Sequence, residues 1–142
     1  EEELPGNAVA PGLPDDAPGL NRALHWAIAH GLVRACHDLS EGGLGVAAAE
    51  MCIAGGLGMR IGISSIHSAG HVALFSESNG RYLITVRATH AARFESRMRK
   101  YTCKRIGVVT RGETLDVEGH FAVSVEELCA AWKYGVENYG GE

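Results

Sequence analysis

Hydrophobic residues in the first half of the chain repeat with a helical period, then form a short continuous run, and then become helical again. This pattern predicts a helix from Pro18 to about His30, which Gly31 ends in a left-handed conformation. A short buried strand over residues 32–37 and a helix over residues 42–54 follow. The second helix is apolar almost all round, so we expect it to be buried. The inner face of the first helix is expected to hold Leu20, Ala23, Leu24, Ala27 and Ile28.

The second half of the chain continues this alternation. Strands are predicted over 59–63, 82–86 and 103–109, a helical turn over 72–75, and a helix from Thr89 to about Tyr101. A hairpin around Gly119 joins residues 113–117 to 121–123, and Ser124 with Glu127 forms a capping box for a last helix. We interpret the charged outer face of the 89–101 helix as a solvated surface, carrying Arg93, Glu95, Arg97, Arg99 and Lys100.

The interleaved elements, about four helices and five or six short strands, predict one layered α/β (α+β) domain with a mixed sheet. Residues 1–17 hold three of the four prolines and are interpreted as a linker, residues 18–136 as the domain, and residues 137–142 as a tail. The chain begins at Glu1 without a methionine, which suggests a piece of a longer polypeptide.

Composition narrows the possible partners. The net charge is -4 and the basic residues are scattered, so no nucleic-acid partner is expected. No apolar run approaches the roughly 20 residues of a membrane span, and no signal peptide is visible. The four cysteines form no CxxC pair and are predicted to be buried, reduced thiols of a cytoplasmic protein. His67 and His71 have a ligand-like spacing, but no further ligand cluster accompanies them.

Residues 36–45 form the first polar stretch that suggests chemistry. Asp38, Ser40 and Glu41 follow a strand, and Gly42 and Gly43 open a helix and leave its first N–H groups unobstructed. A helix N-terminus of this kind suits a phosphate or a metal–phosphate pair. The alternative is a strand-to-helix turn whose glycines only satisfy backbone geometry.

One carboxylate on the buried helix, Glu50, needs a partner or a path to solvent. We expect it either at an exposed edge or paired with an arginine at a domain contact.

A second polar stretch, residues 76–81, precedes the strongest strand. Ser76 and Ser78 offer hydroxyls that suit phosphate oxygens, and Arg81 suits either a phosphate or Glu77. The alternative is a polar turn held by its own side-chain hydrogen bonds.

Together these stretches resemble a known family. The run HDLSEGGLGVAAAEMCIAGGLG, then LFSESNGRYLITV, IGVVT and SVEELCAAW, is similar to the C-terminal domain of phosphoribosylformylglycinamidine synthase. That enzyme belongs to the superfamily of aminoimidazole ribonucleotide synthetase, whose C-terminal domain supplies the expected fold. The resemblance spans about residues 20–134.

The resemblance implies an amidine-forming C–N ligase of purine biosynthesis. It converts formylglycinamide ribonucleotide to formylglycinamidine ribonucleotide with ATP and glutamine-derived ammonia. The implied partners are the ATP-type domains of the same full-length chain, a glutaminase subunit and a small accessory subunit. The implied cofactors are ATP or ADP and magnesium, with Asp38 as the metal ligand. The implied nucleotide contacts are Ser40, Glu41, Gly42, Gly43, Ser76, Glu77, Ser78 and Arg81.

Two departures point to the second, non-catalytic copy of this domain in the family. Asn79 replaces a glutamine of the S-E-S-Q loop, and Glu41 stands where the catalytic copy has a small residue. No catalytic residue is therefore assigned, and the fragment alone is expected to be inactive. The alternatives are a purely architectural docking domain, or a sister enzyme such as the hydrogenase-maturation carbamoyl dehydratase or selenophosphate synthetase.

Overall fold

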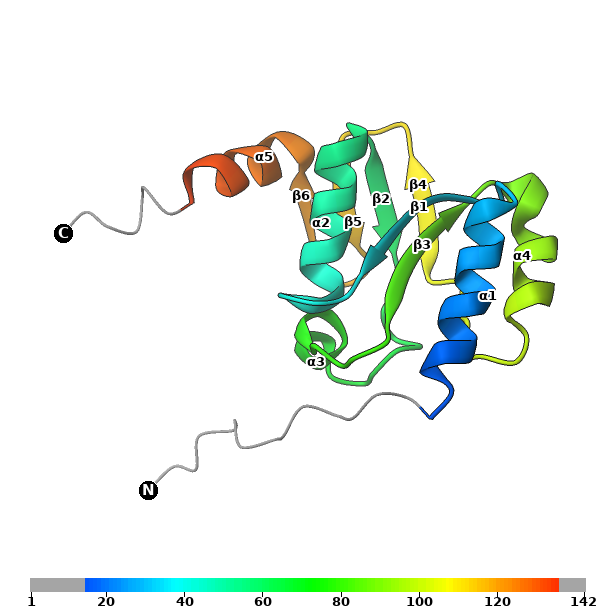
Figure 1. Ribbon diagram of the computed structural model, residues 1–142. Coiled ribbons are helices and arrows are strands. Elements are labelled where there is room, and N and C mark those ends of the chain that lie inside the picture. The colour runs from blue at the N-terminus through cyan, green and yellow to red at the C-terminus, as the bar shows by residue number, and fades with distance from the viewer. Residues whose placement is uncertain (1–14, 136–142) are drawn as a thin grey trace, which may run out of the picture.

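The computed structural model describes residues 15–135, in which helices and strands alternate as the pattern predicts (Figure 1). The mixed α/β class is confirmed. The described elements are α1 (Ala17–Ala29), β1 (Val33–Asp38), α2 (Gly43–Gly55), β2 (Gly58–Ile61), α3 (Gly70–Phe75), β3 (Tyr82–Val86), a 3₁₀ turn η1 (Ala88–His90), α4 (Ala91–Met98), β4 (Gly107–Thr110), β5 (Thr114–Val117), β6 (Phe121–Ser124) and α5 (Val125–Tyr134). Most of the expected linker and the whole tail over 137–142 lie outside the described residues.

The strands divide between two sheets, which corrects the expectation of a single mixed sheet. One sheet is the antiparallel pair β1–β3, and the other has the order β4-β2-β5-β6. The second sheet is mixed, because β2 runs parallel to β5 and antiparallel to β4. None of the helices within residues 15–135 is long and apolar enough to cross a membrane.

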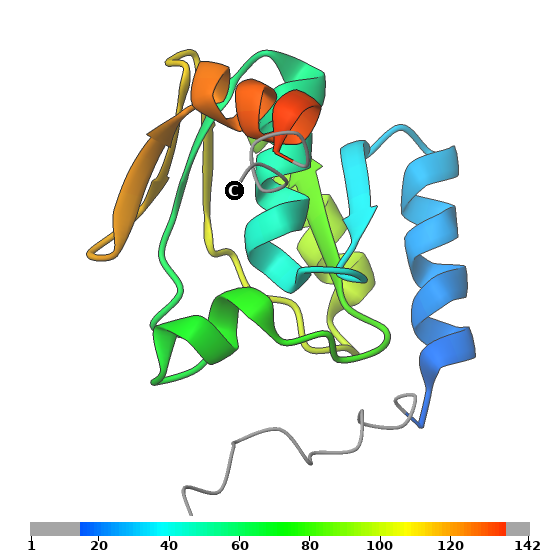
Figure 2. The same cartoon turned by 90° about the vertical axis from the view of Figure 1, so that its left-hand side faces the viewer.

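The helix α2 lies between the two sheets and forms the centre of the larger hydrophobic core. It contacts β1 and β3 of one sheet, β2 and β5 of the other, and also α3 and α5 (Figure 2). Leu44, Ala47, Ala48 and Cys52 of α2 are all buried. Contact with both sheets explains why this helix is apolar almost all round, although Val46 is 38% exposed.

A second core lies on the other face of the β1–β3 sheet. There Leu24 and Ala27 of α1 pack with Phe94 and Met98 of α4, against Val33, Tyr82, Ile84 and Val86 of the strands. The prediction that Ile28 belongs to the inner face is wrong, because its side chain is 47% exposed. Among the described residues, α1 packs against α4 and the strands β1 and β3, so only a narrow stripe of the helix surface is buried.

The strand β1 is not buried as predicted. It pairs only with β3, and Arg34, Ala35 and Cys36 are exposed. The expectation of buried thiols is confirmed for Cys52 and is wrong for Cys36 and Cys103, which are exposed, while Cys129 is half-buried. A sheet of two strands leaves both edges open, which an apolar run in the sequence does not reveal.

Several turn signals are confirmed. Gly31 and Gly119 have φ of 68° and 75°, and the capping box of Ser124 and Glu127 has both of its hydrogen bonds. The prediction that Thr89 caps a helix is wrong, because it lies inside η1 and α4 begins two residues later.

Candidate functional site

The two polar stretches lie side by side at one end of the β1–β3 sheet. Asp38 at the end of β1 is opposite Tyr82 at the start of β3. The backbone N–H of Leu39 donates to the carbonyl of Arg81 at 3.0 Å, which extends the pairing beyond the strands. Residues 38–43, here called the first loop, therefore meet residues 76–81, the second loop.

A hydrogen bond between a side chain and the backbone joins the two loops. The N–H of Gly42 donates to Oε1 of Glu77 at 2.8 Å. Gly42 has a φ of 73° and is the residue before α2, so the Glu77 carboxylate lies at the positive end of this helix. The expectation of unobstructed N–H groups is thus corrected for Gly42, because a protein carboxylate already occupies it.

The close approach of the loops requires glycine at position 43. A Cβ there would lie 2.7 Å from the carbonyl oxygen of Leu74 and 2.8 Å from that of Ser76. Its φ of 62° is also one that residues with side chains rarely adopt. The backbone of the first loop thus packs directly on the end of α3, and Gly43 sets the distance between the loops.

The second loop is held by Arg81. Its Nη1 donates to the Oγ of Ser76 at 2.8 Å and to the Ser76 carbonyl at 3.1 Å. Arg81 therefore bonds to Ser76 and not to Glu77. The local alternative of a turn closed by its own side chains describes this loop well.

The remaining predicted contacts face outward or sit at the loop surface. Ser40 and Glu41 are exposed, and Ser78 is half-buried. The first loop also has an internal bond from the Gly43 N–H to the Ser40 carbonyl at 3.3 Å. These side chains are thus positioned at the common end of the sheet, where a ligand can reach them.

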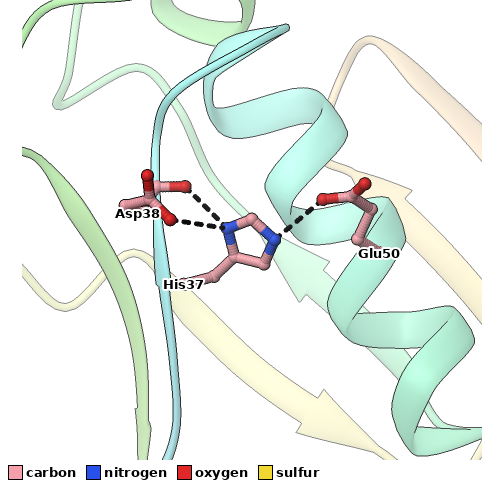
Figure 3. A network of polar contacts seen from close by, with 3 residues as sticks. All are labelled: His37, Asp38 and Glu50. Carbon is pink, nitrogen blue, oxygen red and sulfur yellow. Dashed lines mark hydrogen bonds and ion pairs between the residues drawn. The ribbon is translucent and has the colours of Figure 1, made fainter.

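His37 lies between two carboxylate-bearing residues (Figure 3). Its Nε2 is 2.7 Å from Oε2 of Glu50, and its Nδ1 is 2.6 Å from the Asp38 carbonyl and 3.8 Å from Oδ1 of Asp38. The hydrogen bond to the Asp38 carbonyl, and after it the bond to Glu50, raises the pKa of His37 despite partial desolvation. The protonated ring donates from both nitrogens and ties β1 to α2.

Of the two alternatives for Glu50, the exposed edge is supported and the arginine partner is not found among the described residues. Its carboxylate pairs with His37, and its side chain is 40% exposed. Sequence reasoning missed His37 because it treated this histidine only as the residue before Asp38. The available signal was the position of His37 on the strand before α2, because side chains of that strand can face the helix.

Asp38 is exposed, so its carboxylate is open to an incoming ion. Within the described part of the chain, no group of three or more His, Cys, Asp or Glu side chains is arranged to hold a metal. Magnesium in nucleotide sites is often held by one or two carboxylates together with phosphate oxygens and water. Asp38 fits as one such ligand, with the other ligands supplied from outside these loops.

A comparison with known protein families gives a match for most of the chain. A family model described as AIR synthase related protein, C-terminal domain, matches residues 1–120 of the chain. The chain belongs to this family. The membership expected from the two polar loops is confirmed, and the AIR synthase related C-terminal domain is the fold in which they meet.

Curated relatives of this domain are synthase subunits. A phosphoribosylformylglycinamidine synthase subunit PurL from Parafrankia sp. is 48% identical over 105 residues, which is 71% of this chain and 14% of the relative. The PurL subunit from Bartonella tribocorum is 36% identical over 117 residues, or 81% of this chain and 16% of the relative. The chain thus spans a small part of the length of the relatives it matches.

Solved structures show the same fold at low identity. Thermotoga maritima PurL complexed with FGAR superimposes with a TM-score of 0.74 at 22% identity, covering 87% of this chain and 23% of that one. The hydrogenase maturation protein HypE from E. coli gives 0.57 at 20% identity, covering 74% of this chain and 38% of that one. The fold is therefore shared with a PurL and with a hydrogenase maturation protein.

Proposed function

We propose that this chain is the C-terminal domain of a phosphoribosylformylglycinamidine synthase. The enzyme would convert formylglycinamide ribonucleotide to formylglycinamidine ribonucleotide, using ATP and ammonia derived from glutamine. The observation that carries this proposal is the 48% identity over 105 residues to a subunit named for that synthase. The 20% identity to HypE gives the sister-enzyme alternative much weaker support.

In this proposal the two loops supply part of a nucleotide-phosphate site. Asp38 would hold magnesium, which would supply positive charge to neutralise phosphate oxygens. The hydroxyls of Ser76 and Ser78 donate hydrogen bonds to phosphate. Thermotoga maritima PurL has been solved with ATP, ADP and AMPPCP, which supports nucleotide binding within the family.

Two loop residues are already bonded and therefore limit how phosphate enters. The N–H of Gly42 is taken by Glu77, and Arg81 donates to Ser76. A phosphate that uses the Gly42 N–H has to displace the Glu77 carboxylate, because two anions do not share one donor at this distance. A bound magnesium ion would supply positive charge that lowers the repulsion between the phosphate and this carboxylate.

These residues are too few for the whole reaction. Phosphoryl transfer needs several metal carboxylates and cationic groups around one substrate. The loops offer the carboxylates of Asp38, Glu41 and Glu77 and the already engaged Arg81, and so we infer half of a site, completed by ATP-type domains of the full-length chain. Residues 1–142 alone are expected to be inactive, and the site is expected to hold a structural rather than a reacting nucleotide.

The test uses the full-length polypeptide from the same reading frame. Formylglycinamidine ribonucleotide should form from formylglycinamide ribonucleotide, ATP and ammonia, and nucleotide released on denaturation should be measured by chromatography. Asp38→Ala and Ser78→Ala should each lower nucleotide content, while Glu113→Ala, an exposed carboxylate elsewhere, should not. Normal amidine formation with unchanged nucleotide content in both variants would favour the architectural role. No amidine formation by the full-length wild type would refute the synthase assignment.

A further inference from the structure

The helices α1 and α4 lie side by side on the face of the β1–β3 sheet opposite α2 (Figure 1). Side chains of both helices line an open groove. The groove has a volume of about 780 Å³, and we call it the basic groove. Five cationic side chains and one indole ring define it. They are Arg22 and Trp26 from α1, and Arg93, Arg97, Arg99 and Lys100 from α4 and its C-terminal end. The sequence predicts only a solvated face on residues 89–101. The fold places Arg22 and Trp26 of α1 beside that face.

Within the part of the chain that the structure describes, these cations form no ion pair with a carboxylate. Among residues 15–135 the ion pairs involve His37 and Arg60, and none involves a residue of the basic groove. The one acidic residue that lines the groove, Asp16, accepts the Gly19 N–H at 3.2 Å and caps α1. An uncompensated cationic cluster in a chain of net charge -4 indicates a surface suited to an external anion.

Trp26 holds two of the guanidinium groups in place. The Arg97 guanidinium lies 4.8 Å from the centre of the indole ring, and that of Arg93 lies 5.7 Å from it. Cation–π contacts of this kind restrain the long side chains before any ligand arrives. Arginine forks oriented in this way are suited to bidentate bonds with carboxylates or phosphates.

The arrangement favours an acidic polypeptide over a nucleotide or nucleic acid. Trp26 also stacks on His30 with ring centres 3.8 Å apart, and the Arg97 guanidinium lies over the indole, so these contacts compete with a nucleobase for the ring. All five cations are exposed, whereas a small phosphate is usually held by converging donors. Arg93 and Arg97 instead lie one turn apart on α4, about 6 Å along its axis, and Lys100 follows just after the C-terminal end of the helix. An extended chain places carboxylates of alternate residues about 7 Å apart, which matches such a linear array.

We propose that the basic groove is a docking site for an acidic segment of a partner polypeptide. This surface is separate from the two polar loops, and its role does not depend on the proposed synthase activity. Exposed charge pairs contribute little singly, so binding requires several carboxylates engaged at once. Affinity should accordingly fall steeply as salt is added.

The experiment measures fluorescence anisotropy of a fluorescein-labelled hexaglutamate peptide with the full-length chain. The wild type should bind, and the double variant Arg93→Glu/Arg97→Glu should bind at least about tenfold more weakly. Lys100→Glu alone should show a smaller loss, and the matched control Arg111→Glu, exposed outside the groove, should bind like the wild type. Thermal melting of each variant verifies that it is folded.

Competition decides between classes of anion. Inorganic tripolyphosphate and a 12-nucleotide single-stranded RNA should each displace the peptide only weakly. The proposal is overturned if the wild type does not bind hexaglutamate, or if the double variant and Arg111→Glu lose equal affinity. Tighter binding of tripolyphosphate or of the RNA, abolished by the same double variant, would also overturn it and assign the groove to phosphate ligands.

Discussion

The backbone N–H of Gly42 donates to the carboxylate of Glu77, 2.8 Å away and 35 residues later in the chain. This bond joins the two polar loops without any ligand. It makes the end of the β1–β3 sheet a preformed unit, and it places a negative charge where a phosphate would otherwise bind. The carboxylate of Glu77 therefore lies at the positive end of α2, where it would compete with a bare phosphate for the Gly42 N–H.

We predict that Glu77→Ala destabilises the fold by about 1 kcal/mol, since it leaves the Gly42 N–H without its protein acceptor. The change should be measured by urea denaturation. Glu77→Gln should lose less, because its amide oxygen can still accept the bond. An equal loss in both variants would show that charge, rather than the hydrogen bond, stabilises the loop junction.

Gly43→Ala should cost at least about 2 kcal/mol, because the added Cβ would collide with two carbonyl oxygens of the neighbouring segment at a strained φ. Gly56→Ala is the matched control, because Gly56 has a similar φ of 58° but nothing within 4 Å of an added Cβ. It should cost about 1 kcal/mol, the backbone contribution alone. Equal losses in urea unfolding would contradict the close packing assigned to Gly43.

The His37–Glu50 pair predicts a pH dependence of stability. The pKa of His37 is raised in the folded state from its ordinary value of 6.5, so the folded chain holds this proton more tightly than the unfolded chain. The resulting stabilisation is complete below pH 6.5 and is lost as pH rises through the higher folded-state pKa. Glu50→Ala should lower that pKa and flatten the dependence.

This pair can be tested by NMR titration of the His37 ring together with urea unfolding across the same pH range, in EDTA to exclude metal binding. The exposed His25 serves as an internal reference. An unchanged His37 titration in Glu50→Ala would contradict the contact between its Nε2 and the carboxylate.

The difference in burial between two sides of α2 gives a fourth prediction. Leu44→Ala should destabilise the fold by about 3 kcal/mol, because Leu44 is 2% exposed and its loss leaves a cavity between the two sheets. Val46→Ala should cost less than about 1 kcal/mol, because that side chain is 38% exposed. Urea unfolding of both variants tests this, and comparable losses would mean that α2 is buried on every side.

Local signals identified most elements because they act over a few residues. The left-handed Gly31, the capping box of Ser124 and Glu127, and the β-branched strand β3 each carry their own backbone preference. The apolar composition of α2 also predicted burial correctly, since no solvated helix tolerates such a surface. Thr89 shows the limit, because a capping residue type does not determine where a 3₁₀ turn becomes an α-helix.

By itself, the sequence determined the alternation of elements, the family and the two polar loops as the residues of interest. Only the tertiary structure decided that Glu77 occupies the Gly42 N–H, that Glu50 pairs with His37, and that Trp26 joins the α4 arginines. Each of these contacts connects segments far apart in the chain, so its geometry depends on how strands pair and helices pack. Local preferences specify the individual helices, strands and turns. The division of the strands into two sheets determines which side chains meet.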